Sequence, residues 1–264
     1  MRSATREALA STRAVLADLG GAADLAAGAE ILAAGRAIAG APQLLGLLSD
    51  PTADPAGKKV VIDRVFADQS TATRAVLTAV AGSRWSSHQD LLVGIEDAGI
   101  RAVAATASSD TSIEAELFSF ETAVRSDAGL ELALGTKLGS PAEKSSLVER
   151  LLGGKASQQT ITILSHLVQQ PRGRRIGELV RDASRIVAEQ AGKLVATVTT
   201  AVSLSDGQAA RVARALAERY GKDISINHVV DRSVVGGVRV QLGGDVIDGT
   251  VSTRLSELRL QLAG

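Results

Sequence analysis

The feature that most constrains this chain is its near lack of aromatic residues. One Trp, one Tyr and three Phe make up 2% of 264 residues, while 45% of the residues are hydrophobic. The core must therefore be built from Ala, Leu, Val and Ile. Alanine has the highest helix propensity and lets helix axes approach closely, so the composition favours packed helices.

Charge and cysteine content exclude several classes of protein. The chain has 29 basic and 29 acidic residues and no cysteine. A balanced charge argues against nucleic acid as the main partner, since such binding needs clustered positive charge. The absence of cysteine excludes disulfides and cysteine-ligated metal sites.

No segment of the sequence has the pattern of a signal peptide or a membrane span. The first residues, MRSATREALASTR, carry charges where a signal peptide has an apolar core. The most apolar stretch, residues 22–48, contains Asp24, Glu30 and Arg36, and its uncharged pieces are shorter than the roughly 20 residues of a spanning helix. We expect a protein that reaches a membrane only through a complex.

Helix-capping patterns run through the first 191 residues. Asp54 before Pro55, and Ser70 further on, predict helix starts, and an apolar stripe at helical spacing follows Ser87. Ser3 is a predicted cap of the first helix, which should end near Gly20. These signals predict a first helical bundle over residues 1–108.

Residues 109–191 show the same kind of pattern. Thr111 with Glu114 and Ser140 with Glu143 are predicted capping boxes. A last helix with one apolar face should stop at Gly192. We therefore predict a second helical bundle over residues 109–191.

The two predicted bundles resemble copies of each other. Several residues of the first recur 86 positions later, and two more recur at a spacing of 88. A repeat of this length indicates a duplicated domain rather than a solenoid. The alternative is a chance alignment of two amphipathic bundles. The pairs are Pro55/Pro141, Lys58/Lys144, Asp63/Glu149, Arg64/Arg150, Leu77/Ile163, Arg84/Arg172 and Leu91/Leu179.

After Gly192 the hydrophobic period changes from helical to alternating. Residues 193–204 are rich in β-branched residues, and residues 205–220 begin with a Ser205–Gln208 capping box. Alternating residues then predict three strands, and a final helix places Val251, Leu255, Leu258 and Leu262 on one face. The predicted fold is mainly α: two tandem bundles followed by a small α+β domain, 192–264, with the order β-α-β-β-β-α.

The sequence contains no motif that predicts catalysis, a cofactor or a metal. Residues 149–157 approach a phosphate-binding loop, but Glu149 and Ala156 occupy positions that need glycine and a hydroxyl. The three histidines lie in separate segments without metal-ligand spacing. The basic run 171–175 is typical of a solvated helix start, with contact to phosphate or an acidic partner as the alternative.

The segment VVDRSVVGGVRVQLGGDVIDGTVSTRLSELRLQL resembles the signature of the ATP synthase delta subunit family, which includes the oligomycin-sensitivity-conferring protein. Weaker similarity continues upstream to about Ser112. Thr250 stands where the family usually has serine. The chain is longer than the common form by about one bundle, as in actinobacterial members. The residues that carry the resemblance are Asp231, Gly236, Gly237, Ile247, Asp248, Gly249, Leu255 and Leu258.

The resemblance implies a non-catalytic stator subunit of a proton-translocating F-type ATP synthase. In that family the helical domain binds the N-terminal helices of alpha subunits at the top of the catalytic head. The C-terminal domain holds the b-subunit peripheral stalk. The implied location is peripheral, on the cytoplasmic face of the bacterial cell membrane, with no cofactor and no nucleic acid. A generic helical adaptor without enzymatic activity is the alternative.

Overall fold

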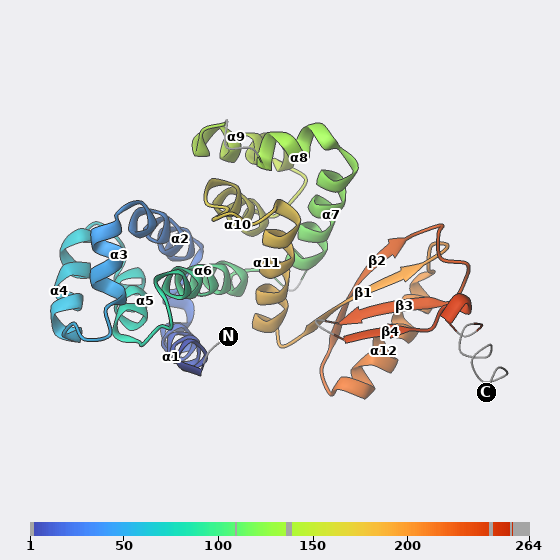
Figure 1. Ribbon diagram of the computed structural model, residues 1–264, viewed down its shortest axis with the longest axis horizontal. Helices are drawn as coiled ribbons and strands as arrows, with labels where there is room; N and C mark the ends of the chain where they lie inside the picture. The colour runs from blue at the N-terminus through green and yellow to red at the C-terminus, as the bar shows by residue number, and fades with distance from the viewer. Residues whose placement is uncertain (1–2, 109, 136–138, 243–244, 254, 256–264) are drawn as a thin grey trace. The chain divides into compact units, whose positions relative to one another are not determined.

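The chain forms two compact units in a computed structural model, Met1–Val187 and Ala188–Gly264 (Figure 1). The structure describes residues 3–108, 110–135, 139–242, 245–253 and 255. The first unit is all helical, and the second contains a four-stranded sheet, which confirms the predicted mainly α fold with a small α+β part. The predicted boundary between two separate bundles, near residue 108, falls inside the first unit and stays a prediction.

Among the described residues, eleven helices belong to the first unit. Six of them, with a short 3-10 turn at Gly20–Ala22, precede residue 108, and five follow it. They are α1 (Ser3–Leu19), α2 (Leu25–Gly40), α3 (Pro42–Ser49), α4 (Pro55–Val65), α5 (Thr71–Gly82), α6 (His88–Ala105), α7 (Ile113–Ser126), α8 (Ala128–Gly135), α9 (Pro141–Leu152), α10 (Gln158–Gln169) and α11 (Ile176–Gln190).

The caps explain where most of these helices begin. The side chains of Asp54, Ser70 and Ser87 accept hydrogen bonds from backbone amides of the first turns of α4, α5 and α6, as predicted. Ser140 and Glu143 form the predicted capping box of α9. The prediction of a capping box at Thr111 and Glu114 is wrong. Ser112, one residue later, caps α7 by accepting a hydrogen bond from the amide of Ala115.

Two hydrophobic cores lie within the first unit. One gathers apolar residues of α1–α6 around buried side chains such as Ile31 and Leu77. The other is built from α7–α11 but also takes Leu32 from α2 and Ile100 and Val103 from α6. The two sets of helices therefore pack against each other, and α6 contributes to both cores.

The two sets of helices repeat in length and burial. α2 and α7 begin 88 residues apart, α3 and α8 86 apart, and α5 and α10 87 apart. Buried residues follow the same spacing, as Leu48 and Leu134 show. Because Ser70 and Ser157 cap equivalent helices, Leu77 corresponds to Leu164 rather than to Ile163. The bounds and caps support a duplication.

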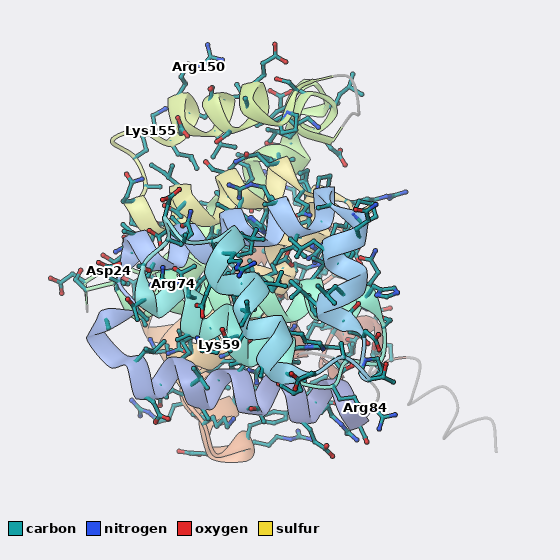
Figure 2. All side chains as sticks on the ribbon, turned by 90° about the vertical axis from the view of Figure 1, so that its left-hand side faces the viewer. Asp24, Lys59, Arg74, Arg84, Arg150 and Lys155 are labelled. Atoms are coloured by element: carbon teal, nitrogen blue, oxygen red, sulfur yellow. The ribbon has the colours of Figure 1, made fainter. Side chains whose placement is uncertain are left out.

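Lys58 and Lys144, which are matched in the repeat, are both buried. Their exposed fractions are 5% and 7%. The Nζ atom of Lys58 donates to the carbonyl of Ala81, 2.9 Å away, at the end of α5. A buried ammonium needs such a partner, and a helix C-terminus supplies free carbonyls. By contrast, Arg150 of α9 and Lys155 of the turn after α9 are exposed cations, and Figure 2 shows them at the surface.

The second unit is a mixed sheet with one crossover helix. β1 (Leu194–Thr200) connects through α12 (Asp206–Tyr220) to the parallel strand β2 (Ile224–Val230). β3 (Val238–Leu242) and β4 (Asp245–Asp248) add antiparallel strands, which gives the order β2-β1-β3-β4. The predicted Ser205–Gln208 capping box opens α12, and Gly221 ends it in a left-handed conformation.

The prediction that a final helix buries its apolar face is wrong where the structure tests it. Residues 251–253 and Leu255 have helical backbone, but Val251 is 42% and Leu255 57% exposed. Shared spacing places side chains on one face; it does not supply a surface to cover that face. Leu258 and Leu262 lie outside the described residues.

Within the described part of the chain, no single helix is long and apolar enough to cross a membrane. α2 and α3 together have the length and composition, but the chain bends by 107° between them.

Candidate functional site: the signature turn, the valine rim and the bundle joint

The glycines of the sequence signature are required by a close approach of two backbones. Gly237 has a φ of +84°, and a Cβ atom there would lie 2.4 Å from the carbonyl oxygen of Gly249. The amide of Gly249 donates to the carbonyl of Val238 at 2.9 Å, and that of Val251 donates to the carbonyl of Gly236 at 3.0 Å. No side chain fits at position 237 without moving the backbone.

Asp248 and Thr250 complete this turn. Oδ1 of Asp248 accepts a hydrogen bond from the amide of Thr250 at 3.0 Å, and Oγ1 of Thr250 accepts one from the amide of Thr253 at 3.4 Å. Hydrogen bonds from Thr250 hold the pKa of Asp248 below its ordinary value. The carboxylate therefore serves the turn, and the hydroxyl at position 250 starts the helical backbone.

Asp231 plays a similar local part in the turn that follows β2. Its Oδ1 accepts from the amide of Ser233 at 2.9 Å. Hydrogen bonds from Ser233 lower the pKa of Asp231. Neither signature carboxylate has the raised pKa of a general acid.

The structure thus brings most signature residues together and leaves others apart. Gly236, Gly237, Asp248 and Gly249 meet in one turn. Asp231 begins the loop that leads to the two glycines. Ile247 lies in β4 opposite Val240 and packs on the sheet core. Leu255 is exposed, and Leu258 is outside the described residues.

Large apolar side chains are exposed at the same end of the sheet. Thr200, the last residue of β1, pairs with Val230 at the end of β2 and with Val238 at the start of β3. The hydroxyl of Thr200 also donates to the carbonyl of Val202. This end lies at the right of the sheet in Figure 1. We call its exposed residues the valine rim: Val202 (72%), Val230 (48%), Val235 (79%), Val251 (42%) and Leu255 (57%).

Sequence reasoning missed the valine rim. Val202 and Val235 lie in connecting segments, where the periodicity of strands and helices gives no information. The available signal was their size, because large apolar residues in loops are unusual unless something covers them.

A second candidate site lies inside the first unit, where the two sets of helices meet. Glu96 of α6 is only 5% exposed, and both of its oxygens contact Nη2 of Arg174 at 2.9 Å. Nη2 of Arg172 also binds Glu96. Nη1 of Arg36 lies 2.8 Å from Nδ1 of His166, whose Nε2 is 3.5 Å from Glu96. We call these five residues the bundle joint.

The bundle joint corrects one prediction. Residues 171–175 were expected to form a solvated helix start, yet Arg172 and Arg174 bind a buried carboxylate from α6. The acidic group that these two arginines contact is a residue of the same chain. Arg175 remains exposed.

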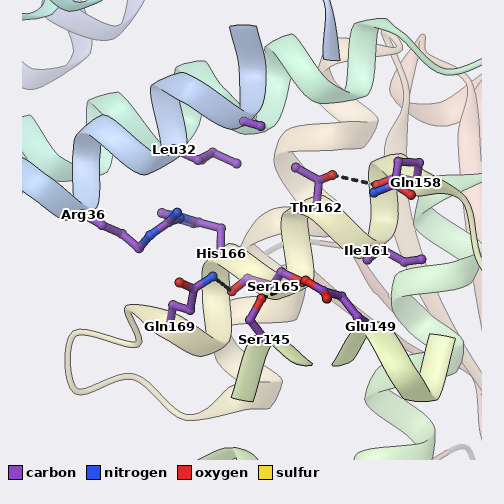
Figure 3. A pocket seen from close by; sticks show the side chains of 11 residues that line it. Leu32, Arg36, Ser145, Glu149, Gln158, Ile161, Thr162, Ser165, His166 and Gln169 are labelled. Atoms are coloured by element: carbon purple, nitrogen blue, oxygen red, sulfur yellow. Dashed lines mark hydrogen bonds between the residues drawn. The ribbon is translucent and has the colours of Figure 1, made fainter. Parts of the chain in front are cut away.

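A cleft of about 220 Å³ opens beside the joint. Figure 3 shows Leu32 and Arg36 on one side, with Arg36 reaching toward His166 of α10. Ser165, which also lines the cleft, has a buried hydroxyl without a partner among the described residues. The lining is mainly polar, which suits water.

The rest of the described chain offers no catalytic arrangement. No group of three or more His, Asp or Glu is placed to hold a metal ion among the described residues. The three histidines stay apart, with His88 near Ser49, His166 in the joint and His228 bonded to Thr200.

The sequence of the chain is similar to those of known proteins. The family model described as "ATP synthase delta (OSCP) subunit" matches residues 100–262. A protein of Leifsonia xyli named ATP synthase subunit delta is 53% identical over 264 residues, covering all of both chains. One of Acidothermus cellulolyticus with the same name is 40% identical over 227 residues, covering 84% of this chain and 82% of its own length.

Among solved structures, a chain in the Toxoplasma gondii mitochondrial ATP synthase hexamer has a TM-score of 0.40 and 22% identity. The match covers 64% of this chain and 97% of that one. This likeness is too weak to carry a conclusion.

Proposed function

Because the chain belongs to the ATP synthase delta (OSCP) subunit family, we propose that it is a non-catalytic stator subunit. In this role it joins the top of the catalytic head to the b-subunit peripheral stalk. The observation that carries the proposal is the signature turn, in which the family residues Gly237 and Gly249 meet. The subunit contributes binding and stiffness, since the head makes ATP only if it does not turn with the rotor.

The proposed site for the b subunit is the valine rim of the second unit. Exposed apolar residues gathered at one end of a domain are typical of protein interfaces. Val202 and Val235 are the most exposed of the set. An amphipathic helix at the end of a stalk can cover such a rim with its apolar face.

The proposed site for the alpha N-terminal helices is the first unit. The family model begins at residue 100 and so covers α7–α11 but not α1–α5. The second set of helices is therefore the better counterpart of the family's single helical domain. The first set would be an added clamp, and two similar bundles give one chain the means to hold two alpha helices.

The location and cofactors follow from this role. The protein would lie on the cytoplasmic face of the membrane and associate with it only through the complex. It needs no cofactor, and it would not bind ATP itself. A generic scaffold outside the synthase would share the bundles, but its partners would be other proteins.

The test is co-purification of the full chain with alpha and b subunits. Val202→Asp combined with Val235→Asp places two charges in the valine rim. We expect loss of the b subunit and retention of the alpha subunit. Val246→Asp, at a 50% exposed residue of β4 that is not part of the valine rim, is the matched control and should keep both partners. Retention of b by the rim variant would refute the b site, and failure of the unaltered chain to bind either subunit would refute the function.

A further inference from the structure

The bundle joint is built around one buried carboxylate with several cationic neighbours. Glu96 comes from α6, while Arg172 and Arg174 come from the segment between α10 and α11. Arg172 has a φ of +49°, a left-handed conformation that is unfavourable for a residue other than glycine. Arg172 binds Glu96 directly while it has this conformation. The contacts around it must therefore compensate for the unfavourable backbone.

His166 is held as a neutral imidazole by its two neighbours. A guanidinium has only donors, so Nδ1 of His166 must accept the hydrogen bond from Arg36. The single ring proton then lies on Nε2, which faces Glu96 at 3.5 Å. The ring therefore accepts the hydrogen bond from Arg36 of α2 in one tautomer only, and its buried Nε2 lies near Glu96 without a hydrogen bond among the described residues.

A second proton on this ring would break the arrangement. It would attach to Nδ1 and point at the Nη1 group of Arg36, so that two donors would face each other. The added charge would also lie close to Arg36 and Arg172. The other charged groups near the ring are Glu96 of α6, Arg174 with its contact Asp182 in α11, and Glu149 of α9 across the cleft.

We propose that the bundle joint is an acid-labile latch, in which protonation of His166 opens the polar contacts of α10 and residues 171–175 with α2 and α6, so that the two sets of helices move apart at the joint. The cleft beside the joint gives water and protons a route to this ring. The proposal does not depend on the stator function, because it concerns only contacts within the first unit.

The direction of the pH effect follows from the two titrating groups. Burial lowers the pKa of His166, and the charges of Arg36 and Arg172 lower it further, against the opposing influence of Glu96. In an open joint the ring regains an ordinary pKa near 6.5, so acid below that value favours opening. The ratio of open to closed molecules should rise by up to roughly tenfold per pH unit until the lowered pKa is reached.

Glu96 adds to the effect at lower pH. Burial would raise its pKa, but His166, Arg172 and Arg174 outweigh burial, and the pKa is lowered from 4.5. Its stabilisation of the closed joint is therefore complete above about pH 4.5 and is lost as the pH falls through the lowered value.

The experiment measures the distance between two spin labels, one on each side of the joint. The chain has no cysteine, so Val60→Cys in α4 and Leu132→Cys in α8, both exposed, give two unique attachment sites. We expect one narrow distance distribution at pH 8 and a second, broader one that grows between pH 6.5 and 5. Absence of that growth would overturn the proposal.

Two variants make the test specific. His166→Gln keeps an acceptor for Arg36 and a donor for Glu96 but does not titrate. The distance distribution of this variant should therefore stay narrow down to pH 5. Glu96→Gln should already be open at pH 8. If His166→Gln broadens like the unaltered chain, or if Glu96→Gln stays closed, the latch is refuted.

A second label pair separates opening from unfolding. Ala10→Cys in α1 with Val60→Cys lies entirely within the first set of helices, at exposed positions. Its distance distribution should not change between pH 8 and 5. Broadening of this pair over the same range would mean that acid melts the helices themselves, and the latch would be wrong.

Discussion

The two sets of helices in the first unit agree in what holds each of them together. In α2–α6, Oε2 of Glu30 accepts hydrogen bonds from the amide of Ser70 at 2.8 Å and the hydroxyl of Thr73 at 2.7 Å. In α7–α11, Glu116 accepts the corresponding bonds from Ser157 and Thr160. The two carboxylates tie equivalent helices together: α2 to the cap of α5, and α7 to the cap of α10. This shared contact between distant segments is difficult to explain by chance alignment of amphipathic helices.

The two sets differ at the residues that join them. The position of Arg36 is Thr122 in the second set, and that of His166 is Ala79 in the first. Neither counterpart can form the contact between Arg36 and His166. A duplication followed by divergence predicts this pattern, because internal contacts are needed in both copies and the joint is needed only once.

The largest effect that tests the comparison comes from matched core truncations. Leu77→Ala and Leu164→Ala remove fully buried side chains at equivalent positions of α5 and α10. Each should lower the free energy of unfolding by about 2–5 kcal/mol, through lost burial and the cavity left behind. Urea denaturation followed by circular dichroism measures the change.

The exposed Leu132 provides the control for the core truncations, since Leu132→Ala should change stability by less than about 0.5 kcal/mol. Ile163→Ala tests the register. If it matched Leu77→Ala while Leu164→Ala had little effect, the one-residue shift between the copies would be wrong.

The next effect concerns the two carboxylates. Glu30→Gln and Glu116→Gln each replace a charged acceptor of several donors with an amide, and we expect a loss of about 1.5–3 kcal/mol from each. Burial raises the pKa of Glu30, but hydrogen bonds from Ser70 and Thr73 outweigh it, and the pKa is lowered.

The contribution of Glu30 should therefore be fully present above pH 4.5 and be lost as the pH falls through the lowered pKa. The free energy of unfolding of the unaltered chain and of Glu30→Gln, measured between pH 7 and pH 3, gives this contribution at each pH. A stability difference that did not shrink in acid would mean that the charge of Glu30 is not what stabilises the cap.

The sequence predicted the parts of this fold that depend on local rules. The caps at Asp54, Ser70 and Ser140 and the box at Ser205 all form, because a capping side chain bonds only to amides two or three residues away. The glycine signature was recognised for the same reason that it is needed: only glycine fits where two backbones approach closely.

Contacts between distant segments could not be predicted in this way. The burial of Lys58 could not be predicted because its partner, the carbonyl of Ala81, lies 23 residues away in the sequence. Arg172 and Arg174 looked like a solvated run because Glu96 lies 76 or more residues away. Leu255 has the spacing of a core residue but is exposed in the structure.

A smaller effect is expected from matched cap removal. Asp54→Ala and Ser140→Ala each leave amides of the first turn of α4 or α9 without an acceptor. The loss should be about 0.5–2 kcal/mol for each, measured by thermal unfolding. Asp54→Ser and Ser140→Asp exchange the caps between the copies and should retain most of the stability. Loss of stability on exchange would show that the two helix starts are not equivalent.

The smallest expected effect comes from transferring a joint residue to the other copy. Thr122→Arg gives α7 the side chain that α2 carries at its equivalent position. Thr122 is exposed, and its hydroxyl bonds only to the carbonyl of Phe118 in the same helix at 2.9 Å. An arginine there extends into solvent, so stability should change by less than about 0.5 kcal/mol.

The converse change, Arg36→Thr, leaves Nδ1 of the buried His166 without its donor and should cost about 0.5–1.5 kcal/mol. Chemical denaturation of both variants measures the difference. Equal effects would show that the copies had not diverged at the joint, because the side chain at this position would then matter as much in α7 as in α2.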